Sequence, residues 1–275
     1  MDWINNIRVM IFDMDGTLYQ EDTFLGRYLT YMLEDRCSEK EIESMIKTAY
    51  NILNGEHFVS LGQYYDFTTD SIFTHTDLVP NRAFSWEGNP LQQEYTKDSN
   101  LFYIGDPWCI ALILGEKLGV SEEVRTNAFN RVRAEMLNAE FAIPKSEVLI
   151  QAFKHIDVEA KILITNSPFE SGEVFLEYLE VLPHFDKAIY NGKKPQGIEK
   201  TMIDLIEKGY KPEEILSIGD NPFNDLYPAR NKGARTVFIS DYRNLDQTPW
   251  DYKVKNIEEL SSFLHNFRKK AVSNK

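Results

Sequence analysis

Two carboxylates separated by one residue stand directly after an early apolar segment. Residues 13–17 read Asp-Met-Asp-Gly-Thr and follow the apolar run 7–12. A side chain at the end of a buried strand can project into a crevice, and a glycine lets the backbone turn sharply beside a ligand. Two acids this close repel each other unless a cation lies between them or one keeps its proton. The segment therefore predicts chemistry by carboxylates, either as cation ligands, as a nucleophile or in proton transfer.

Short apolar runs of the same kind recur in the second half of the chain and must position this chemistry. The runs cover residues 7–12, 161–164, 187–190, 215–218 and 235–239. They are rich in Ile, Val and Phe and end in small or polar residues, which is typical of buried parallel strands. Segments of helical periodicity lie between them, at residues 147–153, 173–182, 198–208 and 225–231. This alternation predicts a doubly wound α/β sheet with reactive groups at the carboxyl ends of its strands.

Polar side chains follow several of these runs, where such a sheet would gather them. They are Thr165, Asn166, Lys193, Lys194, Asp220 and Asp225. The family resemblance given below singles out these residues, and the hydroxyl, ammonium and carboxylates among them match the needs of phosphoryl transfer. That reaction requires an oxygen nucleophile, positive charge against the phosphate oxygens and an acid for the leaving group.

A long detour separates the first expected strand from the rest of the sheet. Residues 23–53 and 108–137 have helical periodicity, while residues 54–105 mix turn-forming residues with many aromatics. We expect an inserted, mainly helical cap domain at residues 20–145, and a discontinuous core domain at residues 1–19 and 146–275. The aromatics could line a substrate pocket, but a small second core covered by loops is the interpretation that we favour.

The four polar segments resemble, in order, the motifs of the haloacid dehalogenase (HAD) superfamily. Asp-x-Asp-Gly-Thr at 13–17 resembles the first motif, Thr165 the second, Lys194 followed by Pro195 the third, and Gly219-Asp220 with Asp225 the fourth. The resemblance covers residues 1–20 and about 145–265 and leaves the insertion nearly unmatched. It implies a Rossmann-like core.

The resemblance also implies a role for each residue. Asp13 would be the nucleophile that forms an aspartyl-phosphate, and Asp15 would be the general acid and base. Thr165 and Lys194 would hold the phosphoryl oxygens, with Lys194 favoured over Lys193 because a proline follows it. The expected phosphate-binding residues are Asp13, Gly16, Thr17, Thr165, Asn166 and Lys194. The expected Mg²⁺ ligands are Asp13, Asp15 through its main-chain carbonyl, Asp220 and Asp225, the last mainly through a bound water.

Within the superfamily, the acid at position 15 favours phosphate esters over halides and phosphonates. The insertion after the first motif favours a small phosphorylated metabolite as substrate. The leading hypothesis is therefore a Mg²⁺-dependent phosphatase. Two alternatives stay open, namely a phosphomutase acting on a sugar phosphate and a non-catalytic phosphate-binding or regulatory protein of the same fold.

Charge and composition exclude several other classes of protein. Lys and Arg number 30 against 43 Asp and Glu, a net charge of −13, which argues against a nucleic-acid partner. We expect no membrane segment and no signal peptide, and the basic tail 268–275 is expected to be a solvated end. Two distant cysteines indicate reduced thiols and a cytoplasmic location. The oligomeric state is not predicted.

Three local patterns imitate functional motifs and are set aside. Gly105-Asp106 resembles the fourth motif but precedes Thr165 and has Ala111 where a second acid is required. The five histidines are scattered without metal-binding spacing. Ser167 lacks the flanking glycines of a serine-hydrolase elbow.

Overall fold

The computed structural model describes residues 2–96 and 99–267, so the basic tail 268–275 lies outside the described residues. The chain divides into two compact units. The core unit comprises Met1–Gln20, Ile143–Asp241 and Trp250–Lys275, and the insertion unit comprises Glu21–Ala142 and Tyr242–Pro249. Within the described residues, no helix has the length and apolar character needed to cross a membrane.

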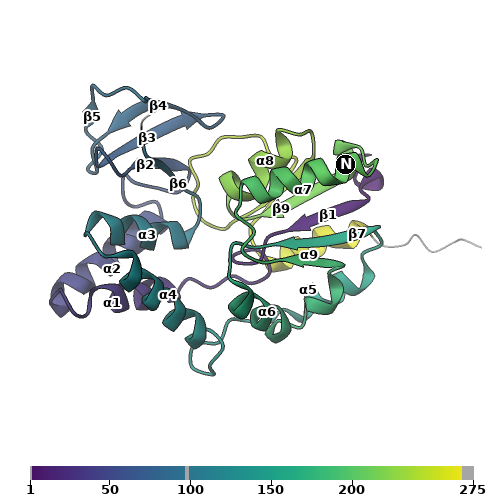
Figure 1. Cartoon of the computed structure of the whole chain (residues 1–275), viewed down its shortest axis with the longest axis horizontal. Coiled ribbons are helices and arrows are strands. Elements are labelled where there is room, and N and C mark those ends of the chain that lie inside the picture. Colours follow the sequence, from purple (N-terminus) through teal and green to yellow (C-terminus); the bar gives the residue numbers. More distant parts are fainter. Residues whose placement is uncertain (1, 97–98, 268–275) are drawn as a thin grey trace, which may run out of the picture. The chain divides into compact units, whose positions relative to one another are not determined.

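The core unit contains a six-stranded, fully parallel sheet, which confirms the predicted fold class. Its strand order is β11-β10-β9-β1-β7-β8, and Figure 1 labels its three central strands β9, β1 and β7. The strands are β1 (Val9–Phe12), β7 (Ala160–Ile164), β8 (Lys187–Ile189), β9 (Ile215–Gly219), β10 (Arg235–Ile239) and β11 (Tyr252–Val254). The sequence analysis did not predict β11, a three-residue edge strand with a lysine at its centre.

Helices cover both faces of this sheet, as expected for a doubly wound fold (Figure 1). They are α5 (Glu147–His155), α6 (Phe169–Tyr178), α7 (Gln196–Glu207), α8 (Tyr227–Arg230) and α9 (Ile257–Leu264). Short 3-10 turns lie at Asp2–Asn6, Leu182–His184, Pro212–Glu214 and His265–Phe267. The sequence analysis did not predict α9 and set α6 four residues too late. It also carried α6 beyond Glu180, whose φ of 61° ends the helical conformation.

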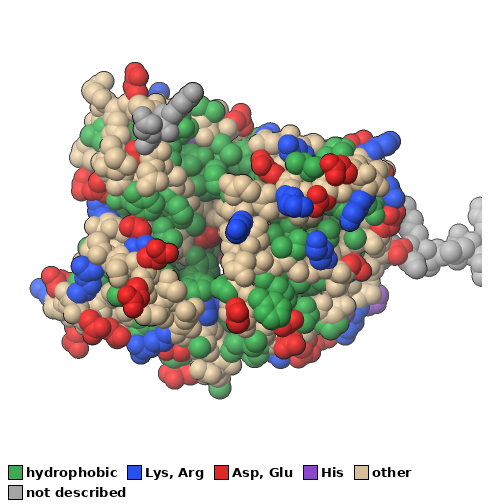
Figure 2. Space-filling model, viewed as in Figure 1, with side chains coloured by type: hydrophobic (Ala, Val, Ile, Leu, Met, Phe, Trp, Pro, Cys, Tyr) green, Lys and Arg blue, Asp and Glu red, His purple; other side chains and the backbone are tan. Residues whose placement is uncertain are grey.

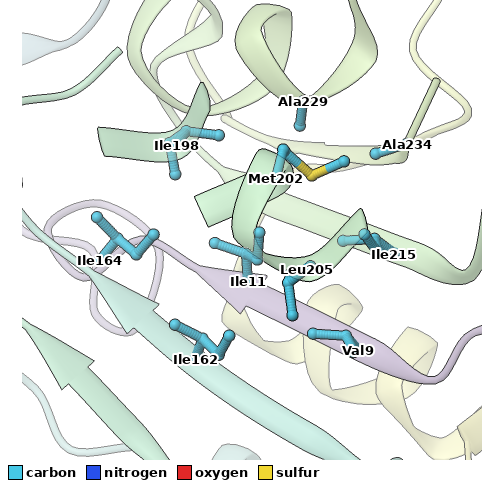
Figure 3. Packing of buried hydrophobic residues seen from close by; sticks show 10 residues of the cluster. All are labelled: Val9, Ile11, Ile162, Ile164, Ile198, Met202, Leu205, Ile215, Ala229 and Ala234. Carbon is cyan, nitrogen blue, oxygen red and sulfur yellow. The ribbon is translucent and has the colours of Figure 1, made fainter. Parts of the chain in front are cut away.

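Alternation along β1 explains how one strand serves both layers. Val9 and Ile11 face α7 and pack with its Met202 and Leu205 (Figure 3). Phe12 points to the other face, where its ring lies 5.2 Å from that of Phe153 in α5. Because successive side chains of a strand point to opposite faces, a run that is apolar throughout is a strand buried on both sides.

The insertion unit contains four helices in its two outer segments, where helical periodicity predicts them. They are α1 (Phe24–Leu33), α2 (Glu39–Leu53), α3 (Pro107–Lys117) and α4 (Glu122–Glu135). The ring of Trp108 stacks on that of Phe24 at 3.8 Å and so joins α3 to α1. The Asp106 side chain accepts a hydrogen bond of 2.9 Å from the Cys109 N–H at the start of α3. The false Gly-Asp motif is thus a helix cap.

The middle of the insertion is a five-stranded antiparallel sheet, so the expectation of loops there was wrong. Its order is β5-β4-β3-β2-β6. The strands are β2 (Gln63–Asp66), β3 (Ser71–Thr76), β4 (Val79–Phe84), β5 (Pro90–Leu91) and β6 (Leu101–Ile104). The two-residue turn between β3 and β4 consists of Asp77 and Leu78, with φ of 47° and 65°. Leucine is a rare choice for that conformation, so the usual glycine signal of a hairpin is missing.

A segment from late in the chain, residues 242–249, belongs to the insertion unit, although the sequence-based division assigned it to the core. The Leu245 N–H donates to the Leu61 carbonyl at 2.8 Å, and the Tyr103 hydroxyl donates to Asp246 at 2.9 Å. A side chain at Gly62 would collide with Asn244 and the Asp246 backbone. This close packing explains why the segment leaves the core between β10 and β11.

Candidate active site

Three neighbouring strands deliver the predicted site residues to one edge of the core sheet. In the sheet β1 lies between β9 and β7, and all three run parallel. Asp13 follows β1, Thr165 follows β7 and Asp220 follows β9. From β1 the chain proceeds to β7 and β8 on one side and then crosses to β9, β10 and β11 on the other, which makes the end of β1 the switch point where such sheets bind ligands.

Carboxylates from these strand ends form a group suited to a divalent cation. One oxygen each from Asp13, Asp220 and Asp225 lies within 4.8 Å of the others. A carboxylate oxygen set is the donor chemistry that Mg²⁺ prefers. Gly16, with φ of 78°, allows this approach, because a Cβ there would lie 2.0 Å from an oxygen of Asp220. The residues present therefore fit the expected metal ion.

A single π-turn at Pro222–Leu226 carries Asp225 back toward the strand ends. The Asn221 N–H donates to the Asp225 carboxylate at 3.0 Å, and the Ser217 hydroxyl donates to the Asp225 carbonyl at 2.7 Å. Gly219 is required beside it, because a Cβ would lie 2.4 Å from that of Asp225. Backbone and side chain of this acid are therefore both held in place.

Lys194 supplies the positive charge among these acids. Its Nζ lies 2.5 Å from Asp13 and 2.7 Å from Asp225, and its side chain is only 5% exposed. Lys193 is exposed, so of the two candidate lysines it is Lys194 that reaches the site. The Asn166 side chain accepts a hydrogen bond of 2.8 Å from the Lys194 N–H and so fixes the loop that carries the ammonium.

Burial changes the pKa values of Asp13 and Lys194. Burial raises the pKa of Asp13 to about 7, against the opposing effect of the Lys194 ammonium and with a further increase from Asp225 and Asp15. Burial by itself would lower the pKa of Lys194, but the carboxylates of Asp13 and Asp225 raise it well above its usual range. Lys194 is therefore a permanent cation in the site.

The Asp13 carboxylate has a second neighbour in Thr17. The Thr17 hydroxyl donates to Asp13 Oδ2 at 3.0 Å, while Lys194 contacts Oδ1. Thr17 is fully buried. The two oxygens of Asp13 therefore have different partners, and the carboxylate has a defined orientation.

Asp15 is held by hydroxyl groups that the sequence analysis did not assign to it. Tyr19 donates to Asp15 Oδ1 at 2.5 Å and Ser167 donates to Oδ2 at 2.9 Å, while the Thr165 hydroxyl is at the limiting distance of 3.5 Å. The sequence singles out Ser167 only as a rejected nucleophile and gives no signal for Tyr19. No sequence motif identifies either, because the Tyr19 contact depends on the tight loop after β1 and the Ser167 contact on how the ends of β1 and β7 meet.

The fold and this site define a hydrolase of the haloacid dehalogenase class. The chain matches the haloacid dehalogenase-like hydrolase family over residues 7–233 and belongs to that family. A curated relative is 23% identical over 99% of this chain and 98% of its own length. It is a glyceraldehyde 3-phosphate phosphatase of Pyrococcus furiosus.

Solved structures share the fold at low sequence identity. A putative phosphatase from Clostridium difficile aligns with a TM-score of 0.53 at 14% identity, covering 94% of this chain and 99% of its own. The putative HAD-hydrolase YfnB of Bacillus subtilis, solved bound to magnesium, aligns with a TM-score of 0.51 at 13% identity. It covers 94% of this chain and 98% of its own. These likenesses support the fold assignment and extend over both units.

Proposed function

We propose that the protein is a Mg²⁺-dependent phosphatase that hydrolyses a small phosphorylated metabolite through an aspartyl-phosphate. The observation that carries the proposal is the convergence of Asp13, Lys194 and Asp225 in one buried ion-pair group, with Asp15 held beside it. A buried carboxylate with a fixed orientation and an adjacent ammonium is suited to attack on an anionic phosphorus centre.

In the first step a carboxylate oxygen of Asp13 attacks phosphorus, and the ester P–O bond breaks. The leaving oxygen takes the proton of the Asp15 carboxyl, so an alcohol departs. Lys194 and the Thr165 hydroxyl would hold the phosphoryl oxygens during the transfer. Because Lys194 already lies against Asp13, it would also hold the phosphate in line with its attacker.

In the second step a water molecule attacks the phosphorus of the aspartyl-phosphate and gives a proton to the Asp15 carboxylate. The bond between Asp13 and phosphorus breaks, which releases inorganic phosphate and restores both acids. One carboxyl group thus serves in turn as general acid and general base. The separation of one hard hydrolysis into two displacements is the advantage of covalent catalysis.

Asp13, Asp220 and Asp225, together with the main-chain carbonyl of Asp15 that the family resemblance implies, would hold the Mg²⁺ ion. When bound, the ion supplies Lewis-acid charge that offsets the negative charge of the phosphate oxygens. The cited magnesium-bound relative supports this choice of metal.

One relative suggests the substrate class, and the charge and the cysteines of the chain bear on its partners and location. The relative that covers the whole chain acts on glyceraldehyde 3-phosphate, which makes triose phosphates the first candidates. On the face shown in Figure 2, acidic and basic side chains are interspersed, which does not favour a nucleic-acid partner. Cys37 and Cys109 are free thiols, which supports the proposed cytoplasmic location.

The test is phosphate release by the purified protein from a panel of small phosphate esters, with and without Mg²⁺. The panel includes para-nitrophenyl phosphate, triose phosphates and sugar phosphates. Release that depends on Mg²⁺ and disappears in Asp13→Asn is expected. Isomerised sugar phosphate without free phosphate would favour a phosphomutase. No turnover together with phosphate binding would favour a non-catalytic protein.

A further inference from the structure

Asp15 must point its proton at the leaving oxygen, and two hydroxyl groups hold its carboxylate from opposite ends. Tyr19 contacts Oδ1 at 2.5 Å and Ser167 contacts Oδ2 at 2.9 Å. The contact with Thr165, at 3.5 Å, is too long to fix the group. We infer that Tyr19 and Ser167 are positioning residues that orient Asp15 for proton transfer. The inference rests on the proposed function and deepens it.

Tyr19 is itself immobilised, so its hydroxyl can act as a fixed point. Its side chain is buried, and its ring lies 6.0 Å from that of Phe175 in α6. The backbone of Tyr19 also forms a parallel bridge with that of Asp15. Donor and acceptor thus belong to one tight loop after β1, and the hydroxyl returns to the carboxylate four residues before it.

Ser167 is anchored from a different strand. Its N–H donates to the Thr165 hydroxyl at 3.0 Å, and its carbonyl accepts from the Asn191 N–H at 2.9 Å. Both backbone groups of Ser167 are therefore engaged, and its side chain starts from a fixed Cα. The clamp on Asp15 joins the end of β1 to the end of β7.

A carboxyl group held at both oxygens cannot rotate about its terminal bond without losing a hydrogen bond. General acid catalysis depends on this orientation, because the proton must lie on the line to the leaving oxygen. A side chain that drifts by about 1 Å loses a large part of its catalytic effect. The clamp therefore matters most for substrates whose leaving group needs a proton.

Leaving groups provide a readout that a purely structural role would not move. An alkyl phosphate such as glycerol 3-phosphate must be protonated as it departs, whereas a nitrophenolate is stable without a proton. The measured quantity is kcat/KM for each ester with Mg²⁺ saturating, since it covers the steps up to formation of the aspartyl-phosphate. Tyr19→Phe keeps the buried ring and removes only the hydroxyl.

We expect Tyr19→Phe to lower kcat/KM for glycerol 3-phosphate by about 10- to 100-fold and for para-nitrophenyl phosphate by less than about threefold. Ser167→Ala should also lower kcat/KM more for glycerol 3-phosphate than for para-nitrophenyl phosphate, but with a smaller difference between the two esters. Ser167→Thr keeps the hydroxyl and should restore kcat/KM for glycerol 3-phosphate. In a protein that already carries Asp15→Asn, adding Tyr19→Phe should lower kcat/KM for glycerol 3-phosphate by less than about a further twofold, because Tyr19 acts through Asp15. Thermal unfolding of each variant checks that the fold is intact.

Two matched variants remove equivalent hydroxyls elsewhere in the core unit. Tyr190→Phe and Ser261→Ala should leave the ratio between the two esters unchanged, since Tyr190 packs on Phe169 and Ser261 bonds within α9. Equal losses for both esters in Tyr19→Phe, or no loss for either, would overturn the inference. A wild-type protein that releases phosphate from no ester of the panel, glycerol 3-phosphate included, would overturn the proposed function itself, and that result would be visible before any variant is made.

Discussion

The core unit and the insertion unit bury different kinds of side chain. At the carboxyl edge of the parallel sheet the core encloses charged groups, with Lys194 between Asp13 and Asp225. The antiparallel sheet of the insertion gathers aromatic rings, such as Tyr64 and Tyr103 with centroids 5.3 Å apart. The Lys117–Asp70 ion pair of the insertion, in contrast, lies partly in solvent.

The contrast shows which interactions serve stability and which serve chemistry. Aromatic pairs contribute about 0.5–1.5 kcal/mol beyond their buried area, so the rings of the insertion stabilise a small sheet. A buried ion pair gains little net stability, because two charges lose their hydration. We therefore infer that the buried charges of the core serve a reaction, whereas the aromatic rings of the insertion serve stability. The following predictions test this difference between the two units.

The largest expected effect is on catalysis. Asp13→Asn removes the proposed nucleophile and should lower kcat for phosphate release at least about 1,000-fold. Its unfolding free energy without Mg²⁺ should not fall at pH 8, because the raised pKa means that ionising Asp13 costs the folded state stability as pH rises above about 4, with the full cost present above about pH 7. Phosphate assays and urea unfolding measure the two effects. Asp204→Asn, at a half-buried position of α7 paired with Lys200, is the control, and a comparable loss of activity there would contradict the assignment.

Lys194→Met should reduce both activity and stability. The substitution leaves the carboxylates of Asp13 and Asp225 buried without their cation, which costs about 3–5 kcal/mol of unfolding free energy. Lys193→Met, at the exposed neighbour, should cost less than about 1 kcal/mol and preserve phosphate release. Urea unfolding of the two variants side by side is the measurement. Equal losses would mean that the ion pair has no special role.

In the insertion unit, the largest effect should come from an apolar contact. Phe24→Ala removes the ring stacked on Trp108 and leaves a cavity, for an expected loss of about 3 kcal/mol. Hydrogen exchange should rise first at the amides of α1 and α3. If the amides of β1 and β9 lose protection equally, the two units unfold together and their comparison as separate stability units fails.

The smallest predicted effect is a pH dependence in the insertion sheet. Burial lowers the pKa of His75, and the nearby Asp246 opposes that shift without reversing it. The unfolded chain then binds this proton more readily, so the contribution of His75 to stability is present above about pH 6.5 and is lost as pH falls below it.

His75→Phe should therefore reduce the fall in Tm between pH 8 and pH 5. The ring would remain between Tyr64 and Tyr103, each 5.6 Å from it at present. His155→Phe, at an exposed position of α5, should leave the fall as it is. An unchanged pH dependence in His75→Phe would show that this imidazole is not protonated on unfolding.

The two sheets also differ in how far the sequence predicts them. Most core strands are largely apolar and end in turn-forming residues, so their type follows from local pattern, except at the edge strand β11 (Tyr252–Val254). Apart from β6 (Leu101–Ile104), which is apolar throughout, the insertion strands lack this pattern. Gln63–Asp66 is buried over its whole length, yet half of it is polar, and the hairpin at Asp77 and Leu78 lacks a glycine. Tertiary pairing overrides local preference there.

The sequence by itself determined which side chains stand at the strand ends, because side-chain type, spacing and the strand pattern are local properties. Asp13, Asp15, Thr165, Lys194, Asp220 and Asp225 are all identifiable in this way. Only the tertiary structure decided which oxygen meets which donor. Tyr19 and Ser167 meet at Asp15 from positions that are more than a hundred residues apart in the chain, and no local pattern encodes a contact between two separate strand ends.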